Sequence, residues 1–288
     1  MKIPAYWAKA TATDTDREGK PASFSCWRSS DHSIEDAHES ALAAAKQVLR
    51  RLLSGNRVGR YGYGETPLRE EIVESIANAQ GEMSAAVTRN GYGSLVLSTD
   101  RVMFIDLDFP LVSVGESLRY FFARLFRPAA VSPAARCESD ARRRLEEFLA
   151  GNPHWGFRLY RTCAGLRALA THDLFDPADE AAQATMQTLG ADPLYVRLCK
   201  AQGCFRARLT PKPWRCGQQG NPPRWPFESD QQARLFQQWE SAYARKQARY
   251  ATCRFLGELG AERVHPEVQG IIELHDRMTR CHERLELA

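Results

Sequence analysis

Residues 84–109 read SAAVTRNGYGSLVLSTDRVMFIDLDF, and this stretch decides the fold class. Residues 84–89 and 92–98 are strand-length segments rich in apolar side chains. The Asn90-Gly91 pair between them is typical of a tight hairpin turn, which needs positive φ angles. A third apolar segment, residues 101–109, follows with almost no linker, so we expect it to pair with residues 92–98 as an interior strand of the same sheet. Successive hairpins interleaved with helices predict an α+β fold with a mainly antiparallel sheet.

The flanking sequence contains a further hairpin and several helices. Residues 3–13 and 22–30 read as strands on either side of a turn-rich segment, which predicts an antiparallel pair. Residues 33–53 repeat apolar side chains at helical spacing, with Ser33 as the N-cap and Asp36 in the capping-box position. The other expected elements are helices at 66–79, 113–150 and 177–190, a strand at 204–210, and two strands joined by a Gly165-containing turn at 156–172.

The C-terminal part is expected to form a helical unit of its own. Residues 210–227 are dense in proline and glycine, which is typical of a linker. Residues 229–260 and 265–287 then predict two long helices that pack as a hairpin. The resulting division is an α+β core with the Asp-x-Asp strand (1–212), a linker (213–227) and a helical hairpin (228–288).

The composition is that of an ordinary globular chain of 288 residues with a formal net charge of +4. A charge this small does not by itself indicate a nucleic-acid-binding protein. No stretch approaches the roughly 18 apolar residues of a membrane span, and the N-terminus lacks the apolar block of a secretory signal. We therefore expect a cytoplasmic protein without a membrane partner, whose eight widely spaced cysteines are reduced and mostly buried.

Two carboxylates stand near the end of the apolar segment 101–109. Asp106 and Asp108 are two residues apart, so on a strand they share one face. Like charges this close raise each other's pKa unless a cation lies between them, and paired carboxylates suit Mg²⁺ or Mn²⁺. The pair therefore predicts a divalent metal site, with solvation or ion pairing to nearby arginines as the alternative. On the metal hypothesis, Asp106→Ala removes metal binding and leaves the fold intact, because a strand-end acid contributes little to the core.

Two windows of the sequence contain basic residues and no acidic ones. They lie between Glu147 and Asp173 and between Asp192 and Glu228. Arginine-bearing, acid-free segments beside an acidic pair are what a metal-bound polyphosphate requires. The basic residues of these windows are Arg158, Arg161, Arg167, Arg197, Lys200, Arg206, Arg208, Lys212, Arg215 and Arg224. Trp214 and Trp225 in the second window either stack nucleic-acid bases or anchor their loop to the core.

The order of these motifs resembles the archaeo-eukaryotic primase, or prim-pol, superfamily. The motifs are FIDLDFP at 104–110, YRTCAGLRALATH at 160–172 and CFRARLTPKPWR at 204–215, with helices between them. The resemblance implies an RRM-like or palm-like core in which metal-bound aspartates join nucleotides. Arg167 stands where the family carries a histidine, and Asp192 is the candidate third carboxylate, so a catalytically altered or inactive member is also consistent.

The resemblance also assigns roles to individual residues. It implies that Asp106 and Asp108 hold Mg²⁺ or Mn²⁺ and that Arg167 lies in the catalytic turn. The residues expected to bind nucleotide or nucleic-acid phosphates are Arg161, Thr162, Gly165, Arg206, Arg208 and Lys212.

A second resemblance concerns the same pair of aspartates. MFIDLDFPL at 103–111 is similar to the first motif of haloacid-dehalogenase-type phosphatases. That resemblance implies Asp106 as the nucleophile and Asp108 as the general acid. It also requires a parallel, doubly wound sheet, which the hairpin signals oppose.

Two weaker candidates complete the set. Cys199, Cys204 and Cys216 have spacing that would need a fourth ligand to bind zinc, and buried free thiols are the expected alternative. His172 at a strand end is either a general base or a hydrogen-bonded structural residue. The sequence thus predicts metal-dependent nucleotidyl or phosphoryl transfer on nucleotides or nucleic acid, with a non-catalytic RNA- or DNA-binding module as the alternative.

Overall fold

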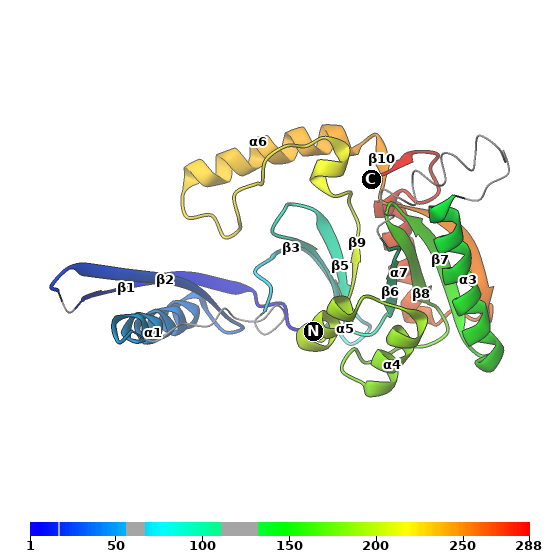
Figure 1. Cartoon of the computed structure of the whole chain (residues 1–288), viewed down its shortest axis with the longest axis horizontal. Coiled ribbons are helices and arrows are strands. Elements are labelled where there is room, and N and C mark those ends of the chain that lie inside the picture. The colour runs from blue at the N-terminus through cyan, green and yellow to red at the C-terminus, as the bar shows by residue number, and fades with distance from the viewer. Residues whose placement is uncertain (17, 56–66, 111–131) are drawn as a thin grey trace.

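The computed structural model describes residues 1–16, 18–55, 67–110 and 132–288. The chain is a mixed α+β protein whose sheets are mostly antiparallel, so the predicted fold class is confirmed. Two four-stranded sheets form the main body, and an N-terminal unit projects from one side of it (Figure 1). Among the helices of the described ranges, none combines the length and the apolar content that crossing a bilayer requires.

The N-terminal unit is a two-stranded hairpin packed on one helix. It consists of β1 (Tyr6–Thr15), β2 (Pro21–Ser30) and α1 (Ile34–Leu53). Small side chains allow the close approach, because Ala12 of the hairpin and Ala45 of the helix are both buried in a cluster separate from the main core. Ser33 caps α1 by accepting the backbone N–H of Asp36 at 3.1 Å. The predicted hairpin, helix and N-cap are confirmed.

The first sheet has the strand order β3-β4-β5-β9 and every pair in it is antiparallel. Its strands are β3 (Glu71–Ala77), β4 (Met83–Arg89), β5 (Leu95–Thr99) and β9 (Phe205–Arg208). The predicted β4–β5 hairpin is confirmed, but its turn is longer than an Asn-Gly turn. Asn90 Oδ1 accepts the N–H groups of Tyr92 and Ser94, and the positive φ is at Gly93.

The helix predicted at 66–79 is wrong over its described part. Residues 71–77 form β3, which pairs with β4 through a register with two irregularities. Pro67 is an acceptable first helical residue, but pairing with the edge of β4 overrides this local preference. Thr66, the expected N-cap, lies outside the described residues.

The second sheet has the order β11-β7-β8-β6 and is also antiparallel. Its strands are β6 (Phe104–Asp108), β7 (Gly156–Thr162), β8 (Gly165–Ala170) and β11 (Cys253–Gly260). The predicted β7–β8 hairpin is confirmed. The predicted pairing of residues 101–109 with 92–98 is wrong, because β6 pairs with β8 at one edge of this second sheet.

The predicted C-terminal helical hairpin is also wrong. Strand β11 separates α6 (Asp230–Gln247) from α7 (Pro266–Thr279) and pairs with β7. Cys253 of β11 and Val268 of α7 are fully buried in the main core, so this segment belongs to the α+β body and not to a separate unit. Residues 229–260 have a helical pattern throughout, so the sequence does not predict strand β11. The strand forms because these residues pair with β7, which is distant in the chain.

The remaining elements lie outside the two four-stranded sheets. They are α3 (Pro133–Gly151), α4 (Glu180–Leu189), α5 (Pro193–Gln202), the 3₁₀ turn η1 (Pro213–Cys216), β10 (Tyr250–Ala251) and β12 (Glu286–Leu287). Two of them, β10 and β12, form a short parallel pair. Helix α3 confirms the second half of the helix predicted at 113–150, whose first half is largely outside the described residues. Helix α4 begins later than predicted, after an Asp179 cap, and α5 was not predicted. All eight cysteines are free and five are buried, as expected.

Candidate functional site

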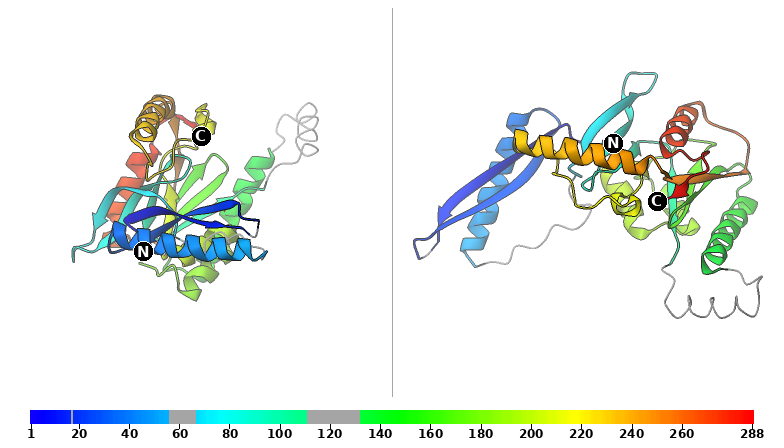
Figure 2. Two further views of the ribbon diagram at one scale, coloured as in Figure 1. Left: turned by 90° about the vertical axis from the view of Figure 1, so that its left-hand side faces the viewer. Right: turned by 90° about the horizontal axis from the view of Figure 1, so that it is seen from above.

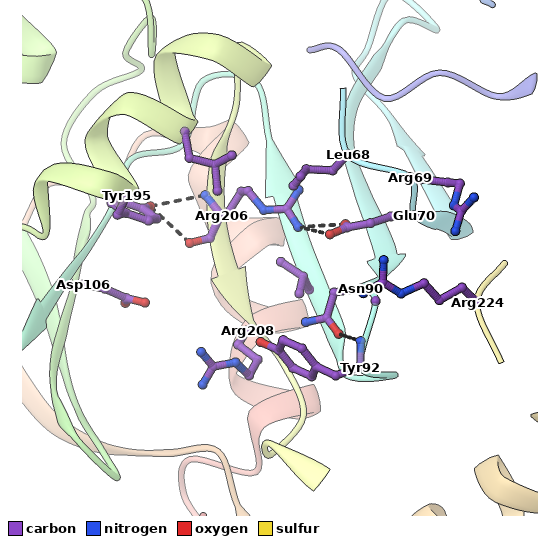
Figure 3. Close-up of a pocket in the computed structure, with 13 residues that line it drawn as sticks. Leu68, Arg69, Glu70, Asn90, Tyr92, Asp106, Tyr195, Arg206, Arg208 and Arg224 are labelled. Carbon is purple, nitrogen blue, oxygen red and sulfur yellow. Dashed lines mark hydrogen bonds and ion pairs between the residues drawn. The ribbon is translucent and has the colours of Figure 1, made fainter. Parts of the chain in front are cut away.

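A cavity of about 420 Å³ lies between the two sheets (Figure 3). Asp106 of β6 is on one wall, Arg206 and Arg208 of β9 are central, and Arg69 and Arg224 are on the opposite wall. The two sheets are joined beside the cavity by the hydroxyl of Tyr195, which lies 2.8 Å from the carbonyl oxygen of Phe104 and 3.1 Å from that of Arg206. Residues from both sheets, the segment before β3 and the proline-rich loop therefore meet at one site.

The two acids that line the cavity are already paired with arginines. Arg206 Nη2 donates to both carboxylate oxygens of Glu70, at 2.9 and 2.7 Å, and the Thr88 hydroxyl donates to the same carboxylate at 2.6 Å. Burial by itself lowers the pKa of Arg206, but the charge and hydrogen bonds of Glu70, together with the nearby Cys204 and Cys199, outweigh burial and raise the pKa. Arg206 therefore carries a charge that is already neutralised inside the protein.

Asp106 is the partner of Arg167, which lies directly opposite it across the β6–β8 ladder. Arg167 donates through Nε to Oδ1 at 2.7 Å and through Nη2 to Oδ2 at 3.0 Å, a bidentate geometry. Burial favours the neutral acid, yet the Arg167 charge holds the pKa of Asp106 below its usual value. Arg167 is only 2 % exposed and belongs to the core, whereas Asp106 is half-buried at the cavity wall.

A hydrogen-bonded chain continues from Arg167 across the same face of the sheet, where Tyr160 is its partner on β7. Arg167 Nη1 donates to the carbonyl oxygen of Arg208 at 2.9 Å and lies 3.3 Å from Nε2 of His275. His275 Nδ1 in turn lies 3.1 Å from Asp276, which also accepts from Tyr160 at 2.7 Å. This network assigns the proton of the neutral imidazole to Nδ1. Burial is the main reason that the pKa of His275 falls to about 4.

Three other arginines of the cavity have no acidic partner. Within the described part of the chain, Arg69, Arg208 and Arg224 form no ion pair. Arg69 instead lies over the ring of Trp27, 4.3 Å from its centroid. Burial and the nearby charge of Arg224 lower the pKa of Arg69, and Glu228 opposes this shift. The cavity therefore holds a surplus of positive charge that an anion would neutralise.

The residues expected to bind a divalent metal do not fit one as they are arranged. Both oxygens of Asp106 accept hydrogen bonds from Arg167, whereas Mg²⁺ needs carboxylates that are free to coordinate it. Asp108 lies on the same face with an exposed side chain, and partial desolvation by its neighbours together with the charge of Asp106 raises its pKa. Asp192, the candidate third carboxylate, accepts the N–H of Leu194 at the start of α5. The alternative of an arginine ion pair describes Asp106 best.

Three of the six predicted phosphate-binding residues belong to the β7–β8 turn. Arg161 donates to the carbonyl oxygens of Thr162 and Gly165 and pairs with Glu138 at 3.2 Å. A Cβ at Gly165 would lie 2.1 Å from the Leu107 carbonyl oxygen, so glycine is needed for the close approach of β6. Arg161, Thr162 and Gly165 are absent from the cavity wall, and of the predicted set only Asp106, Arg206 and Arg208 line it.

Lys212 and two aromatic residues lie next to the arginines. Lys212 is 5.6 Å from the ring of Trp214, which is 56 % exposed and contacts Tyr92 edge-on at 5.2 Å. Burial, then Arg208 and Arg215, lower the pKa of Lys212. Tyr92 lines the cavity, so aromatic faces and cations alternate beside it. Trp225 forms a cis peptide with Pro226 and does not line this cavity.

The weaker candidates lie elsewhere. Nδ1 of His172 accepts the N–H of Gly156 at 3.3 Å, and the ring packs 4.5 Å from Trp155, which favours the structural interpretation of His172. The cysteines at 199, 204 and 216 do not form a three-ligand cluster; in the described ranges such a cluster consists of Asp276, Cys281 and His282. Asp276 in that cluster already accepts from Arg158 and Tyr160, so it is not free to bind a metal.

Sequence reasoning missed Arg69, Glu70, Tyr92 and Tyr195 as lining residues. Arg69 and Glu70 lay within the helix expected at 66–79, which hid their position beside a sheet. Comparison of the chain with protein-family models, curated proteins and solved structures finds no match in any of the three. The resemblance to the prim-pol superfamily therefore stays a prediction.

Proposed function

We propose that the chain is a non-catalytic nucleic-acid-binding module whose cavity holds backbone phosphates of RNA or DNA. One observation supports this above all: Arg69, Arg208 and Arg224 converge on one cavity, and none has a carboxylate partner in the described ranges. The acids that share the cavity, Glu70 and Asp106, are neutralised by other arginines. A cytoplasmic location is part of the same proposal.

The chemistry of the cavity suits phosphate better than a neutral ligand. Guanidinium groups donate to phosphate oxygens in a planar, bidentate geometry, and they stay charged even when partly buried. Burial lowers the pKa of Arg69, and the nearby charge of Arg224 lowers it further, so holding these two guanidinium groups together has an electrostatic cost. A bound phosphate would relieve this repulsion.

The aromatic neighbours favour a nucleic acid over inorganic phosphate. Tyr92 lines the cavity and contacts Trp214, which lies beside Lys212. Basic grooves interleaved with aromatic rings are typical of proteins that bind single strands, because each base has a face that can stack.

Metal-dependent nucleotidyl or phosphoryl transfer is the second candidate. It is favoured by the position of Asp106 in the same cavity as Arg208, but it requires Asp106 to leave Arg167. The phosphatase alternative depends on a parallel sheet, and both four-stranded sheets are antiparallel. If addition of Mn²⁺ strengthened nucleotide binding in the wild type and not in Asp106→Asn, the second candidate would replace the first.

Fluorescence anisotropy with labelled single-stranded RNA and DNA of about 12 nucleotides tests the proposal. Arg208→Ala is expected to weaken binding roughly tenfold, the loss of one charge-assisted contact. Arg143→Ala is the matched control, because it removes the same charge from an exposed position on α3 outside the cavity. Absence of binding by the wild type, or equal losses in the two variants, would contradict the proposal.

A further inference from the structure

A second cavity, of about 580 Å³, adjoins the first. Arg69 and Arg224 line both cavities, so these two side chains lie between them at the wall opposite Asp106. The second cavity is also lined by Trp27 of β2, Pro222 of the proline-rich loop, and Leu235 and Trp239 of α6. It therefore brings together the N-terminal unit, the loop and a helix that are far apart in the sequence.

Specific contacts hold these three segments in place. Lys9 of β1 forms an ion pair with Glu228, just before α6, at 2.7 Å. Figure 2 shows, in its right-hand view, α6 running from beside the β1–β2 hairpin towards the main body. Trp239 packs on Gly93, where a Cβ would lie 2.3 Å from the indole, and its Nε1 donates to the Gly220 carbonyl oxygen at 3.2 Å. The wall of the second cavity is thus built by packing and not by a chance approach.

The two cavities differ in chemistry. The first is lined by cations, whereas the second presents aromatic and apolar surface from Trp27, Leu235 and Trp239. Leu235 is 49 % exposed, so apolar surface remains open in this cavity. The acid that lines it, Glu228, is already paired with Lys9. A ligand that occupies both cavities needs an anionic part and a flat apolar part joined by a chain.

We propose that the ligand is a single-stranded nucleic acid that spans both cavities, with its phosphates at Arg208, Arg224 and Arg69 and a base in the second cavity. This inference rests on the proposed function and adds the strandedness and the path of the ligand. Bases of a duplex are stacked and paired, so they cannot enter an aromatic cavity, whereas an unpaired base can. The site then needs more than a mononucleotide to be filled, since the two volumes are separate.

Two variants on different elements test the second cavity in the full-length protein. Trp27→Ala removes an aromatic face, and Leu235→Glu places a negative charge in the second cavity from an exposed helix position. Ser241→Glu is the matched control for the second variant, because it adds the same charge to an exposed position of α6 that lines neither cavity. Circular dichroism and the thermal midpoint verify that each variant is folded.

The affinity for a labelled 12-nucleotide single strand is then compared with that for a duplex of the same sequence and for a mononucleotide. Base stacking contributes about 1–3 kcal/mol, so Trp27→Ala should weaken single-strand binding roughly fivefold or more. Leu235→Glu should also weaken it, and Ser241→Glu should not. The wild type should prefer the single strand to both other probes.

The outcomes separate this inference from the function on which it rests. If Arg208→Ala weakens binding while Trp27→Ala and Leu235→Glu bind as the wild type does, the second cavity is not part of the site and only this inference fails. This inference also fails, and the proposed function does not, if the wild type binds the duplex as tightly as the single strand or more tightly. If the wild type binds none of the three probes, both this inference and the proposed function fail.

Discussion

Removal of the Asp106 carboxylate tests whether its ion pair with Arg167 stabilises the fold. Arg167 is almost completely buried, and Asp106 supplies two of its four hydrogen bonds as well as its counter-charge. In Asp106→Ala the Arg167 guanidinium would keep only the carbonyl oxygen of Arg208 and the neutral imidazole of His275 as partners. The sequence predicts that Asp106→Ala leaves the fold intact, whereas the ion pair seen in the structure predicts a destabilised variant.

The size of the effect follows from the burial of the surviving charge. Breaking a buried ion pair by removing one partner costs about 3–5 kcal/mol, a large share of a typical free energy of unfolding of about 5–15 kcal/mol. Asp108→Ala is the matched control, because Asp108 is exposed two residues further along the same strand face. Its substitution should change the free energy of unfolding by no more than about 0.5 kcal/mol.

Urea denaturation followed by circular dichroism measures both variants. A third variant, Asp106→Leu with Arg167→Met, removes both charges and should recover most of the loss, since no buried ion is left unpaired. If Asp106→Ala were as stable as Asp108→Ala, the ion pair would contribute nothing. Asp106 would then be available for a metal, and the second candidate function would gain support.

Three further predictions concern the stability of the fold. The pKa of His275 is about 4 in the folded protein against 6.5 for an unperturbed histidine, so the unfolded chain takes up a proton first as the pH falls. Stability should therefore fall by about 3 kcal/mol between pH 6.5 and 4, and urea midpoints across this range should show a smaller slope in His275→Gln. Gly165→Ala should destabilise by at least about 1–3 kcal/mol through its clash with the Leu107 carbonyl, whereas Gly270→Ala, with open space around its Cβ within α7, should stabilise by about 0.5–1 kcal/mol. If the thermal midpoints of Gly165→Ala and Gly270→Ala shifted in the same direction, the contrast between the crowded and the open site would be wrong. Tyr195→Phe should cost about 1 kcal/mol in urea denaturation, because its hydroxyl bridges the two sheets, and an unchanged midpoint would show that the bridge is not needed.

Local signals in the sequence predicted local structure well. Ser33 was recognised as an N-cap because its bond to the backbone of Asp36 needs only residues three apart. The β4–β5 and β7–β8 hairpins were recognised because their strands are joined by short turns. These features depend on neighbours in the chain, which the sequence displays directly.

Pairing between distant segments was not predictable in the same way. Strand β6 was assigned to the wrong sheet because nothing in its own residues distinguishes β5 from β8 as a partner. The register of β6 on β8 is what places Arg167 opposite Asp106, so the neutralisation of that acid was hidden as well. Residues 71–77 and 253–260 were assigned to helices because their strand partners lie elsewhere in the chain.

The candidate site was therefore predicted in part. Asp106, Arg206 and Arg208 were expected at one site and do line one cavity. Their roles differ from the expectation, because two of the three are neutralised by residues whose position only the tertiary fold determines. Arg224 stood in an acid-free window of the sequence, whereas Arg69 was hidden within the expected helix.

The most direct test of phosphate binding is the salt dependence of single-strand affinity between 50 and 200 mM salt. Each phosphate contact to a single strand contributes about −0.7 to the slope of log K against log salt, so three arginines predict a slope of about −2. Replacement of Arg69, Arg208 and Arg224 by glutamine should bring the slope close to zero. A flat dependence in the wild type, or the same slope in the triple variant, would contradict the assignment of these arginines as the phosphate-binding groups.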